Sequence, residues 1–265
     1  AKICGKKVIQ RVGLVSDLRN NFKFRVIQAA VVDKIIVPCN YIKEGLKKLS
    51  WLKQGKIFVV HNGKDLRKYH PKKWYIEVRR ELGIAGNAVL LCVSSQLTKT
   101  KGHVYLLEAF SLLKERSGDI KLIIIGQGPL REELEGKAKA LGLDNYVTFL
   151  GHRNDINRVV DVADIAVLPS LEEGFPNTVV EYMALEKPVV ATNIAGIPEV
   201  VEDQETGFLV PPSDSEKLAG ALERLIKDKD VREKMGRKGR ERIERLFNIE
   251  DKVLDLERIF TNEIC

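Results

Sequence analysis

The chain has few cysteines and no long apolar run, and both features limit the classes of protein to which it can belong. Its four cysteines, Cys4, Cys39, Cys92 and Cys265, are scattered and form no C-x-x-C pair, so the sequence suggests neither a disulfide framework nor a zinc site. No stretch of about 18 apolar residues occurs, which excludes a transmembrane helix, and no signal-peptide pattern opens the chain. The reducing cytoplasm is therefore the simplest location.

Metal and dinucleotide signatures are missing as well. No H-x-x-E or H-E-x-x-H motif occurs, so we expect neither a bound metal nor a cofactor. The run Gly126-Gln127-Gly128-Pro129 begins like a dinucleotide-binding loop, but Arg131 stands where that fingerprint requires its third glycine. A nicotinamide-dependent enzyme is therefore excluded.

Positive charge exceeds negative charge. The formal net charge is +7, and basic residues gather in segments 2–25, 43–56 and 64–80. Such segments serve nucleic acid, anionic lipid or phosphorylated substrates, or they are solvated faces without a partner. The aromatic and basic residues do not interleave as in nucleic-acid readers, so we expect no nucleic-acid partner.

Strand and helix patterns alternate through the larger part of the chain. The 265 residues suffice for one large or two modest domains. Continuous apolar runs separated by amphipathic stretches indicate a Rossmann-like, doubly wound α/β sheet of parallel strands, which binds ligands at the carboxyl ends of its strands. We predict strands at 31–37, 57–60, 90–95, 121–126, 147–151, 165–170, 188–192 and 207–210. We predict helices at 41–49, 104–115, 130–141, 177–185, 199–202, 215–227 and 249–260.

Two glutamates carry the strongest chemical signal. Glu173 follows the predicted strand 165–170, and Glu181 lies about one turn inside the helix that Pro176 can open. Backbone N–H groups between Gly174 and Thr178 would point out of the helix N-terminus, where negative charge is favoured. Free N–H groups beside two carboxylates can hold a phosphate and sugar hydroxyls together. This combination suits a nucleotide diphosphate sugar.

The flanking residues add a specific resemblance. Ser170, Glu173, Gly174, Phe175, Glu181, Met183, Ala184 and Pro188-Val189-Val190-Ala191 match the motif S-x-x-E-G-F-x5-E-A-M-A-x-G-x-P-V-V-A. This stretch resembles retaining GT-B-type glycosyltransferases of the group 1, or family 4, class. The resemblance runs over about residues 31–260 and implies the GT-B fold. Glu186 replaces the glycine of the motif.

The resemblance implies roles for individual residues. Glu181 would bind the ribose hydroxyls, and Glu173 would lie beside the transferred sugar. Lys101 would neutralise the leaving diphosphate. Gln96 stands where the family has an arginine and brings no charge, although the nearby Lys99 could substitute for it. We take Glu173 and Lys101 as the catalytic candidates.

The remaining donor-binding candidates lie at strand ends. They are the helix entrance Gly174, Phe175, Pro176, Asn177 and Thr178, the turn glycine Gly126, and Gly151, His152 and Arg153, whose backbone contacts the nucleotide base in the family. Turn geometry alone would also explain Gly126, and His152 would fit equally well as a surface residue.

The same resemblance suggests three parts. Residues 1–72 would be a remnant of the acceptor-side domain, 73–246 the nucleotide-sugar-binding domain, and 247–265 a helix that crosses back. Because the chain begins with Ala1 and the family's first domain is far longer, we expect a truncated or processed sequence.

The expected function is transfer of a sugar, by a hexosyltransferase-type enzyme, from a nucleotide diphosphate sugar to a hydroxyl acceptor. The acceptor would be a sugar, a glycan or a lipid-linked sugar in envelope polysaccharide, lipopolysaccharide or glycolipid synthesis. The basic amino-terminal region would then face anionic lipid on the inner side of the membrane. Two alternatives stay open: a nucleotide-sugar-binding module without turnover, and a GT-B-like nucleotide-sugar epimerase.

Overall fold

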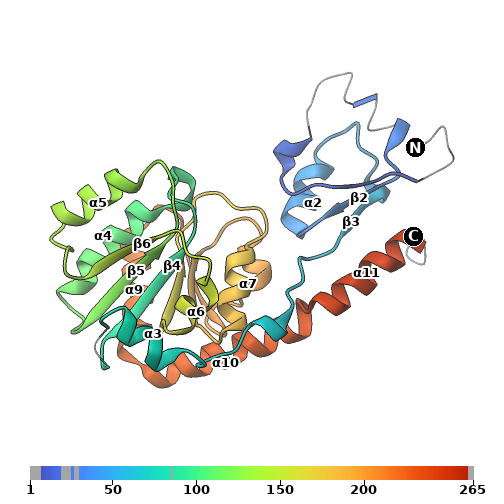
Figure 1. Cartoon of the computed structure of the whole chain (residues 1–265). Helices are drawn as coiled ribbons and strands as arrows, with labels where there is room; N and C mark the ends of the chain where they lie inside the picture. The colour runs from blue at the N-terminus through green and yellow to red at the C-terminus, as the bar shows by residue number, and fades with distance from the viewer. Residues whose placement is uncertain (1–6, 19–24, 27–29, 85, 262–265) are drawn as a thin grey trace.

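The computed structural model describes residues 7–18, 25–26, 30–84 and 86–261. It contains a small unit and a large unit, each built on its own parallel sheet, and the chain passes between them twice (Figure 1). Cys4, Cys265 and parts of the basic segment 2–25 lie outside the described residues.

The large unit is a six-stranded parallel sheet in the order β6-β5-β4-β7-β8-β9. Counted along the chain from β4, this is the order 3-2-1-4-5-6 of doubly wound folds. The predicted α/β class and doubly wound parallel sheet are thereby confirmed. The strands are β4 (Val89–Ser94), β5 (Ile120–Ile125), β6 (Val147–Gly151), β7 (Ile165–Leu168), β8 (Val189–Thr192) and β9 (Gly207–Val210).

Helices cover both faces of this sheet, because its strands are apolar on both sides. Leu91 and Val93 of β4 belong to one core cluster, with α4, α5 and α9. Leu90 and Cys92 point to the opposite face and join a second cluster, with α6, α7 and α8. The helices are α3 (Tyr75–Glu81), α4 (His103–Lys114), α5 (Arg131–Ala140), α6 (Ile156–Asp161), α7 (Asn177–Ala184), α8 (Ile197–Val200), α9 (Ser215–Lys227) and α10 (Lys229–Leu246).

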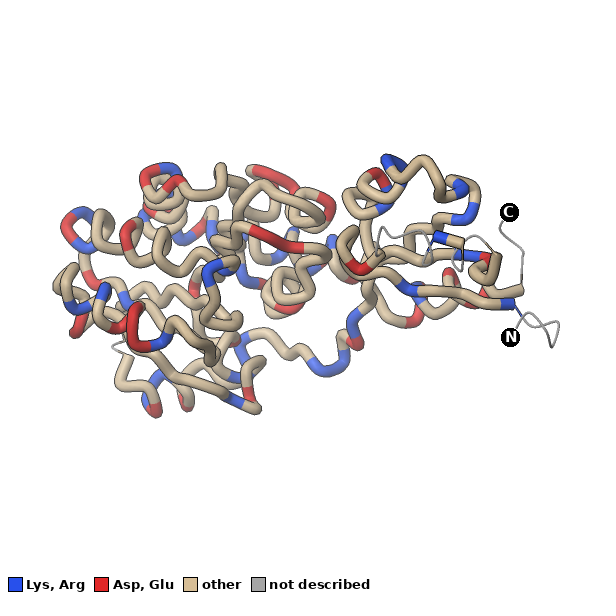
Figure 2. The backbone as a smooth tube through the Cα atoms, turned by 90° about the horizontal axis from the view of Figure 1, so that it is seen from above, with Lys and Arg blue, Asp and Glu red and all other residues tan. Residues whose placement is uncertain are grey.

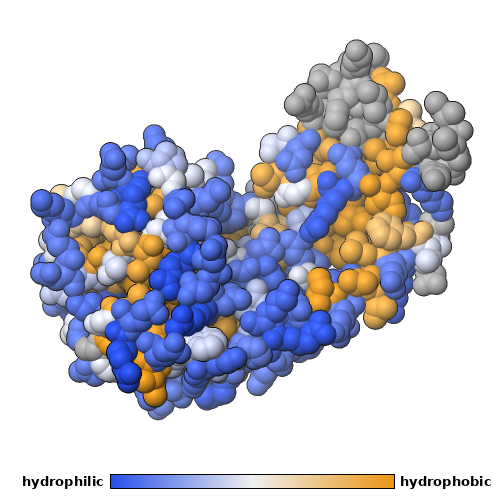
Figure 3. All heavy atoms as spheres, in the orientation of Figure 1, coloured by the Kyte–Doolittle hydropathy of each residue, from blue (hydrophilic) through white to orange (hydrophobic). Residues whose placement is uncertain are grey.

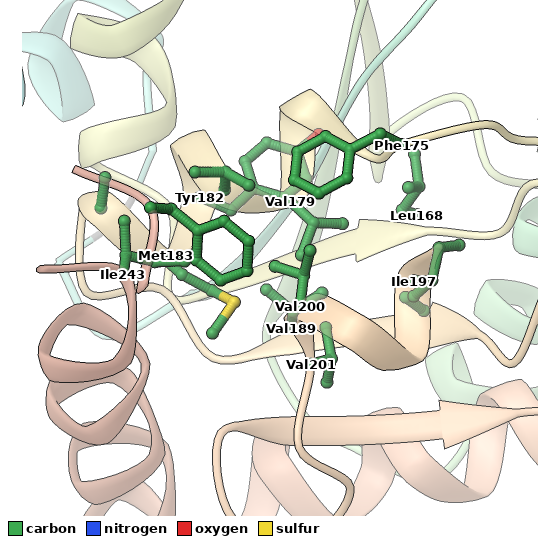
Figure 4. Packing of buried hydrophobic residues seen from close by; sticks show 14 of the residues in the cluster. Leu168, Phe175, Val179, Tyr182, Met183, Val189, Ile197, Val200, Val201 and Ile243 are labelled. Atoms are coloured by element: carbon green, nitrogen blue, oxygen red, sulfur yellow. The ribbon is translucent and has the colours of Figure 1, made fainter. Parts of the chain in front are cut away.

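Helix α7, which carries Glu181, packs deeply into the large unit. Its residues Val179, Tyr182 and Met183 are buried between the sheet and α10, whose Ile243 closes the cluster (Figure 4). The Tyr182 hydroxyl also accepts a hydrogen bond of 2.6 Å from the backbone N–H of Ser94, the last residue of β4. The helix that carries Glu181 is therefore fixed to the end of the central strand.

The small unit has three parallel strands in the order β1-β2-β3, namely β1 (Ile9–Arg11), β2 (Lys34–Val37) and β3 (Ile57–Val59). Helix α2 (Asn40–Lys47) packs on this sheet. Helix α11 (Ile249–Thr261) returns from the large unit, and its Ile259 packs against Ile36 and Val60. Apolar atoms gather over this unit in Figure 3, and Tyr41, Leu254 and Phe260 are each about half exposed.

Short 3-10 turns complete the described elements at Val15–Asp17, Gln54–Lys56, Leu66–Lys68 and Lys99–Lys101. None of the helices in the described ranges combines the length and the apolar character that crossing a membrane requires.

Most predicted elements are present, with ends that differ by one or two residues. The strand predicted at 31–37 starts only at Lys34, because Val31 is helical. The helix predicted at 199–202 lies at Ile197–Val200, because Pro198 favours a helix start there and Val201 is extended. The sequence analysis missed β1, α3, α6 and the long helix α10.

Two backbone crossings connect the units, and they are bonded to each other. The Lys64 N–H donates to the Phe247 carbonyl at 2.8 Å, and the Ile249 N–H donates to the Lys64 carbonyl at 3.1 Å. The rings of His61, Phe175 and Phe247 meet beside this crossing, with centroids 5.4–5.8 Å apart. The crossing is therefore a packed, hydrogen-bonded junction.

A carboxylate of the large unit also holds the start of α2. Glu199 accepts hydrogen bonds from the backbone N–H groups of Asn40 and Tyr41 at 2.9 and 3.0 Å, and His61 Nε2 lies 3.1 Å away. Burial alone would raise the pKa of Glu199, but these hydrogen bonds outweigh it and hold the pKa below its ordinary value. The ionised form therefore joins the two units.

We predict that Glu199→Gln destabilises the chain at neutral pH by about 1–2 kcal/mol, as loss of a helix cap does. Since the folded pKa of Glu199 lies below its ordinary value of 4.5, its stabilisation is complete above that value. It is lost as the pH falls through the folded pKa. Urea unfolding at a series of pH values should show the difference between the two proteins shrinking in acid.

The matched control is Glu202→Gln. The Glu202 side chain is 55% exposed and pairs with Arg242 on the surface of the large unit. This substitution should therefore lower the free energy of unfolding only slightly. Equal losses in the two variants, or a loss from Glu199→Gln that does not vary with pH, would contradict the assignment.

Candidate functional site

The predicted catalytic pair lies where the direction of the sheet connections reverses. Strands β4 and β7 are neighbours, but β4 is followed by α4 on one face and β7 by α7 on the other. The loops that leave such adjacent strands diverge and open a crevice at their carboxyl ends, which is where doubly wound sheets bind ligands. Lys101 follows β4, and Glu173 follows β7.

Glu173 and Lys101 form an ion pair in this crevice. Lys101 Nζ donates to Glu173 Oε1 at 2.6 Å, and the Ser170 hydroxyl donates to the same oxygen at 2.8 Å. The Glu173 side chain is 11% exposed and that of Lys101 24%, so both are accessible to a ligand only from the crevice. The structure thus brings together the two residues that the sequence analysis took as catalytic candidates.

The pair depends on a close backbone approach between the two loops. Gly102 has a φ of 65°, and a Cβ atom there would lie 2.0 Å from the Pro169 carbonyl oxygen. The Leu171 N–H donates to the Thr100 carbonyl at 2.7 Å, and the Thr192 hydroxyl donates to the Ser170 carbonyl at 2.6 Å. Glycine at position 102 therefore lets the lysine loop lie against the glutamate loop.

A buried histidine, His103, lies at the start of α4, two residues after Lys101. His103 is 1% exposed, and its Nε2 lies 3.1 Å from the Ser95 hydroxyl. Burial, together with the positive charge of Lys101, lowers the pKa of His103 to about 4. The ring is therefore neutral at physiological pH and places no second charge beneath Lys101.

A cavity of about 620 Å³ opens between the two units at this pair. The large unit lines it with Lys101, Glu173 and Gly174. The small unit contributes Val15 and Tyr41, among others. A volume of this size accommodates a small organic ligand.

The entrance to α7 has free donors. Pro176 is the N-cap residue, directly before the first helical residue Asn177. Among the described residues, none accepts a hydrogen bond from the backbone N–H of Gly174, Phe175 or Thr178. Unsatisfied N–H groups at a helix N-terminus favour an anion. The Phe175 ring itself is buried in the junction, so only its backbone can meet a ligand.

Glu181 faces a residue of the crossing segment. Lys64 Nζ donates to Glu181 Oε1 at 2.5 Å, and both side chains are only partly exposed. Asn62 Nδ2 similarly donates to the Asn177 side-chain oxygen at 3.0 Å. Neither Lys64 nor Glu181 lines the cavity at Glu173, so the two glutamates serve different parts of the crevice.

The other predicted residues lie at neighbouring strand ends. Gly126 follows β5, and a Cβ atom there would lie 2.0 Å from the Ser95 carbonyl oxygen, so this glycine lets the turn pack against the loop after β4. Gln96 and His152 are exposed. Arg153 is paired with Asp155 and Glu81, and these hydrogen bonds raise its pKa. Gly151 ends β6 with a φ of 69°.

The sequence analysis missed Lys64, His61 and Glu199. The run His61-Asn62-Gly63 was interpreted only as a turn, and Lys64 follows it directly. Glu199 was assigned only to a helix. Polar side chains directly after a strand end were the available signal for His61 and Lys64, whereas Glu199 gives no sign in sequence of its contact with α2, which is more than 150 residues away.

We predict that Gly102→Ala costs more stability than Gly118→Ala. Both glycines have nearly the same left-handed φ, 65° and 66°, but a Cβ atom at position 118 meets nothing within 4 Å. The control should lose about 1–2 kcal/mol through its backbone conformation. The Gly102 variant should lose a further 1–3 kcal/mol or so through steric overlap. Urea unfolding measures the free energy of unfolding of both variants. Equal losses would mean that the close approach to Pro169 adds nothing to the cost of the substitution at position 102.

Comparisons with known proteins point to one family. The sequence profile described as "Glycosyl transferases group 1" matches residues 75–242, which include Lys101, Glu173 and Glu181. The alpha-D-kanosaminyltransferase of Streptomyces kanamyceticus is 34% identical over 161 residues, 60% of this chain and 42% of that protein. The UDP-Gal:alpha-D-GlcNAc-diphosphoundecaprenol alpha-1,3-galactosyltransferase of Escherichia coli is 30% identical over 238 residues, 87% of this chain and 61% of that protein.

Solved structures agree on the fold. The structure of Anabaena Alr3699/HepE in complex with UDP-glucose superposes with a TM-score of 0.87 over 98% of this chain and 74% of that one, at 22% identity. The chain spans about half the length of the curated relatives it matches. Because the family profile covers more than half of the sequence and the fold agrees, this chain belongs to the group 1 glycosyl transferases.

Proposed function

We propose that the protein transfers a hexosyl group from a nucleotide diphosphate sugar to a hydroxyl acceptor, with retention of configuration, as an enzyme of the family 4 type. The observation that carries the proposal is the Glu173–Lys101 pair at the switch point of the sheet, beside the free N–H groups of the α7 entrance. A site with a cation and helix N–H groups suits a diphosphate, and a carboxylate beside them suits sugar hydroxyls.

In this proposal Lys101 neutralises the diphosphate as its bond to the sugar breaks. Lys101 then exchanges its contact with Glu173 for the phosphate oxygens, and Glu173 becomes free to accept hydrogen bonds from the sugar. The amides of Gly174, Phe175 and Thr178 face the same charge. Gln96 supplies hydrogen bonds but no charge, so Lys101 carries most of the positive charge near the leaving group.

Glu181 binds the ribose hydroxyls. Its carboxylate is already aligned by Lys64, and an ionised carboxylate accepts hydroxyl hydrogen bonds about twice as strong as neutral ones. The backbone of Gly151, His152 and Arg153 lies at the next strand ends and would contact the base, as would the turn at Gly126. We propose uridine as the nucleoside, because the Anabaena structure is a complex with UDP-glucose and the name of the E. coli relative specifies UDP-Gal.

The acceptor would enter from the small unit. The cavity wall there includes Val15 and Tyr41, and the E. coli relative's name specifies a lipid-linked sugar acceptor. We therefore propose a lipid-linked or glycan acceptor in envelope polysaccharide or glycolipid synthesis, at the cytoplasmic face of the membrane. Residues 1–72 would belong to the acceptor-side domain, 73–246 to the donor domain and 247–265 to the returning helix.

The donor site predicts selective stabilisation by one nucleotide. UDP should raise the melting temperature of the chain more than GDP or ADP does. Glu181→Gln should weaken UDP binding by about 10–100-fold, since a hydrogen bond to a charged group is worth about 1.5–3 kcal/mol. Titration by thermal shift measures this, with the ligand-induced change compared rather than the absolute melting temperature.

Glu115→Gln is the matched control, because Glu115 is an exposed carboxylate at the C-terminal end of α4, at the opposite edge of the sheet from the crevice. UDP affinity in this variant should equal that of the original chain. A Glu181→Gln variant that binds UDP as tightly as the control would contradict the assignment of Glu181 as the ribose-binding residue.

Lys101 is predicted to recognise the diphosphate rather than the nucleoside. Lys101→Gln should weaken UDP binding by about tenfold or more, which corresponds to at least 1.4 kcal/mol, but leave uridine affinity unchanged. Isothermal titration with both ligands gives the ratio. Equal weakening of UDP and uridine would instead indicate that the substitution disturbs the whole crevice.

A further inference from the structure

A second cavity, of about 690 Å³, lies at the opposite edge of the large sheet from the Glu173 site. Its walls include Ala163 and Asp164, just before β7 begins, and Lys187 and Pro188, just before β8 begins. Helices α3 and α10 and the linker residues Lys72 and Lys73 complete it. Because all six strands run in the same direction, their amino ends are remote from the crevice at their carboxyl ends.

The cavity has an excess of positive charge. Seven lysines and arginines and four carboxylates line it: Lys72, Lys73, Arg80, Lys187, Lys229, Arg232 and Arg237 against Glu77, Asp164, Glu186 and Glu233. Two of the carboxylates are neutralised by arginines outside the lining, since Glu77 pairs with Arg158 and Asp164 with Arg79. Figure 2 shows basic residues along the segment that joins the two units.

Four of the cations lack a carboxylate partner among the described residues, and three of these four are exposed. Lys229 and Arg237 both pair with Glu233, and Lys187 is buried against Asp161. Within the described ranges, no carboxylate pairs with Lys72, Lys73 or Arg80, all of which are exposed. Their charges are therefore available to a ligand.

The backbone that presents these cations is anchored. Buried Asp161 accepts hydrogen bonds from the backbone N–H of Lys72 at 2.6 Å and of Trp74 at 3.0 Å. Lys72 is held with a φ of 61°, in the left-handed region that lysine rarely adopts. Arg232 is fixed by two carbonyls at the end of α9, at 2.6 and 2.8 Å. The wall is thus a built surface, with cations converging from three separate segments.

The lining also offers an apolar wall. Tyr75, Ile76 and Pro188 lie in it, and Ile76 is 74% exposed although it is a large apolar side chain. Lysine and arginine together favour phosphate oxygens, and the apolar wall suits the organic part of a ligand. A carboxylate ligand would use fewer of the available donors.

We propose that this cavity is a second ligand site, for a phosphate-bearing organic molecule, with Lys72, Lys73 and Arg80 as its phosphate ligands. The phosphate belongs either to a free metabolite-sized compound or to the headgroup of an anionic lipid, and the chemistry of the site is the same in both cases. The inference rests on this cavity alone and is independent of the proposed transferase function.

The test uses inorganic pyrophosphate as probe and amide NMR spectra as readout. It is carried out in the Lys101→Gln variant, so that the crevice at the other edge of the sheet has lost its cation. Pyrophosphate should shift the amide signals of residues 72–80 and 229–237. Lys73→Gln combined with Arg80→Gln should weaken its affinity by about tenfold or more, the effect of losing roughly 1.4 kcal/mol of charge-assisted binding.

The matched control is Lys139→Gln, an exposed lysine of α5 outside the cavity, which should leave the affinity unchanged. Melting temperatures check that the variants fold. The proposal is overturned if pyrophosphate shifts no signal in 72–80 and 229–237, or if the double variant binds as tightly as the control.

Vesicle flotation then distinguishes the two sources of phosphate. Binding to vesicles that contain phosphatidylglycerol, but not to phosphatidylcholine alone, with loss in the double variant, assigns the site to a lipid headgroup. Pyrophosphate binding without retention on either vesicle assigns it to a free phosphate compound. Vesicle binding that survives in the double variant would instead place the lipid contact elsewhere and remove that source from the proposal.

Discussion

The backbone contact between the loops after β4 and β7 is the constraint on which the candidate site depends. The hydrogen bond from Leu171 to Thr100 and the bare Cα of Gly102 against Pro169 set the distance between these loops. Lys101 and Glu173 are carried on them and meet as a result. The site is thus positioned by main-chain contacts. Substitution of other side chains in these loops would leave those contacts in place.

Carboxylates in this chain act largely as acceptors for groups that the fold brings from far away in sequence. Glu199 receives the first N–H groups of α2, Asp161 receives those of the linker, and Glu181 receives Lys64. Each joins the large unit to the small unit or to the segment between them. For Glu199, these hydrogen bonds outweigh the effect of burial and hold its pKa below the ordinary value.

The large sheet could be predicted from the sequence, because continuous apolar strands are local signals, and Glu173 stood out because it follows such a strand. Lys101 was assigned only by resemblance to a family motif, and its contact with Glu173 was not predicted. Helix α10 was missed for an equally local reason: its buried positions are mainly Met235, Gly236, Gly239 and Ile243, so the apolar stripe is too sparse to stand out among its charges. The contacts of Lys64 and Glu199 were missed because their partners are 117 and 159 residues away. No periodicity encodes contacts of that range.

The paired crossings at Lys64 and Phe247–Ile249 have a mechanical consequence. Two chain segments that pass side by side, and are bonded to each other, cannot slide along one another without breaking these hydrogen bonds. Any change in the angle between the units therefore moves both segments together, and the contact of Glu199 with the start of α2 adds a second attachment between the units.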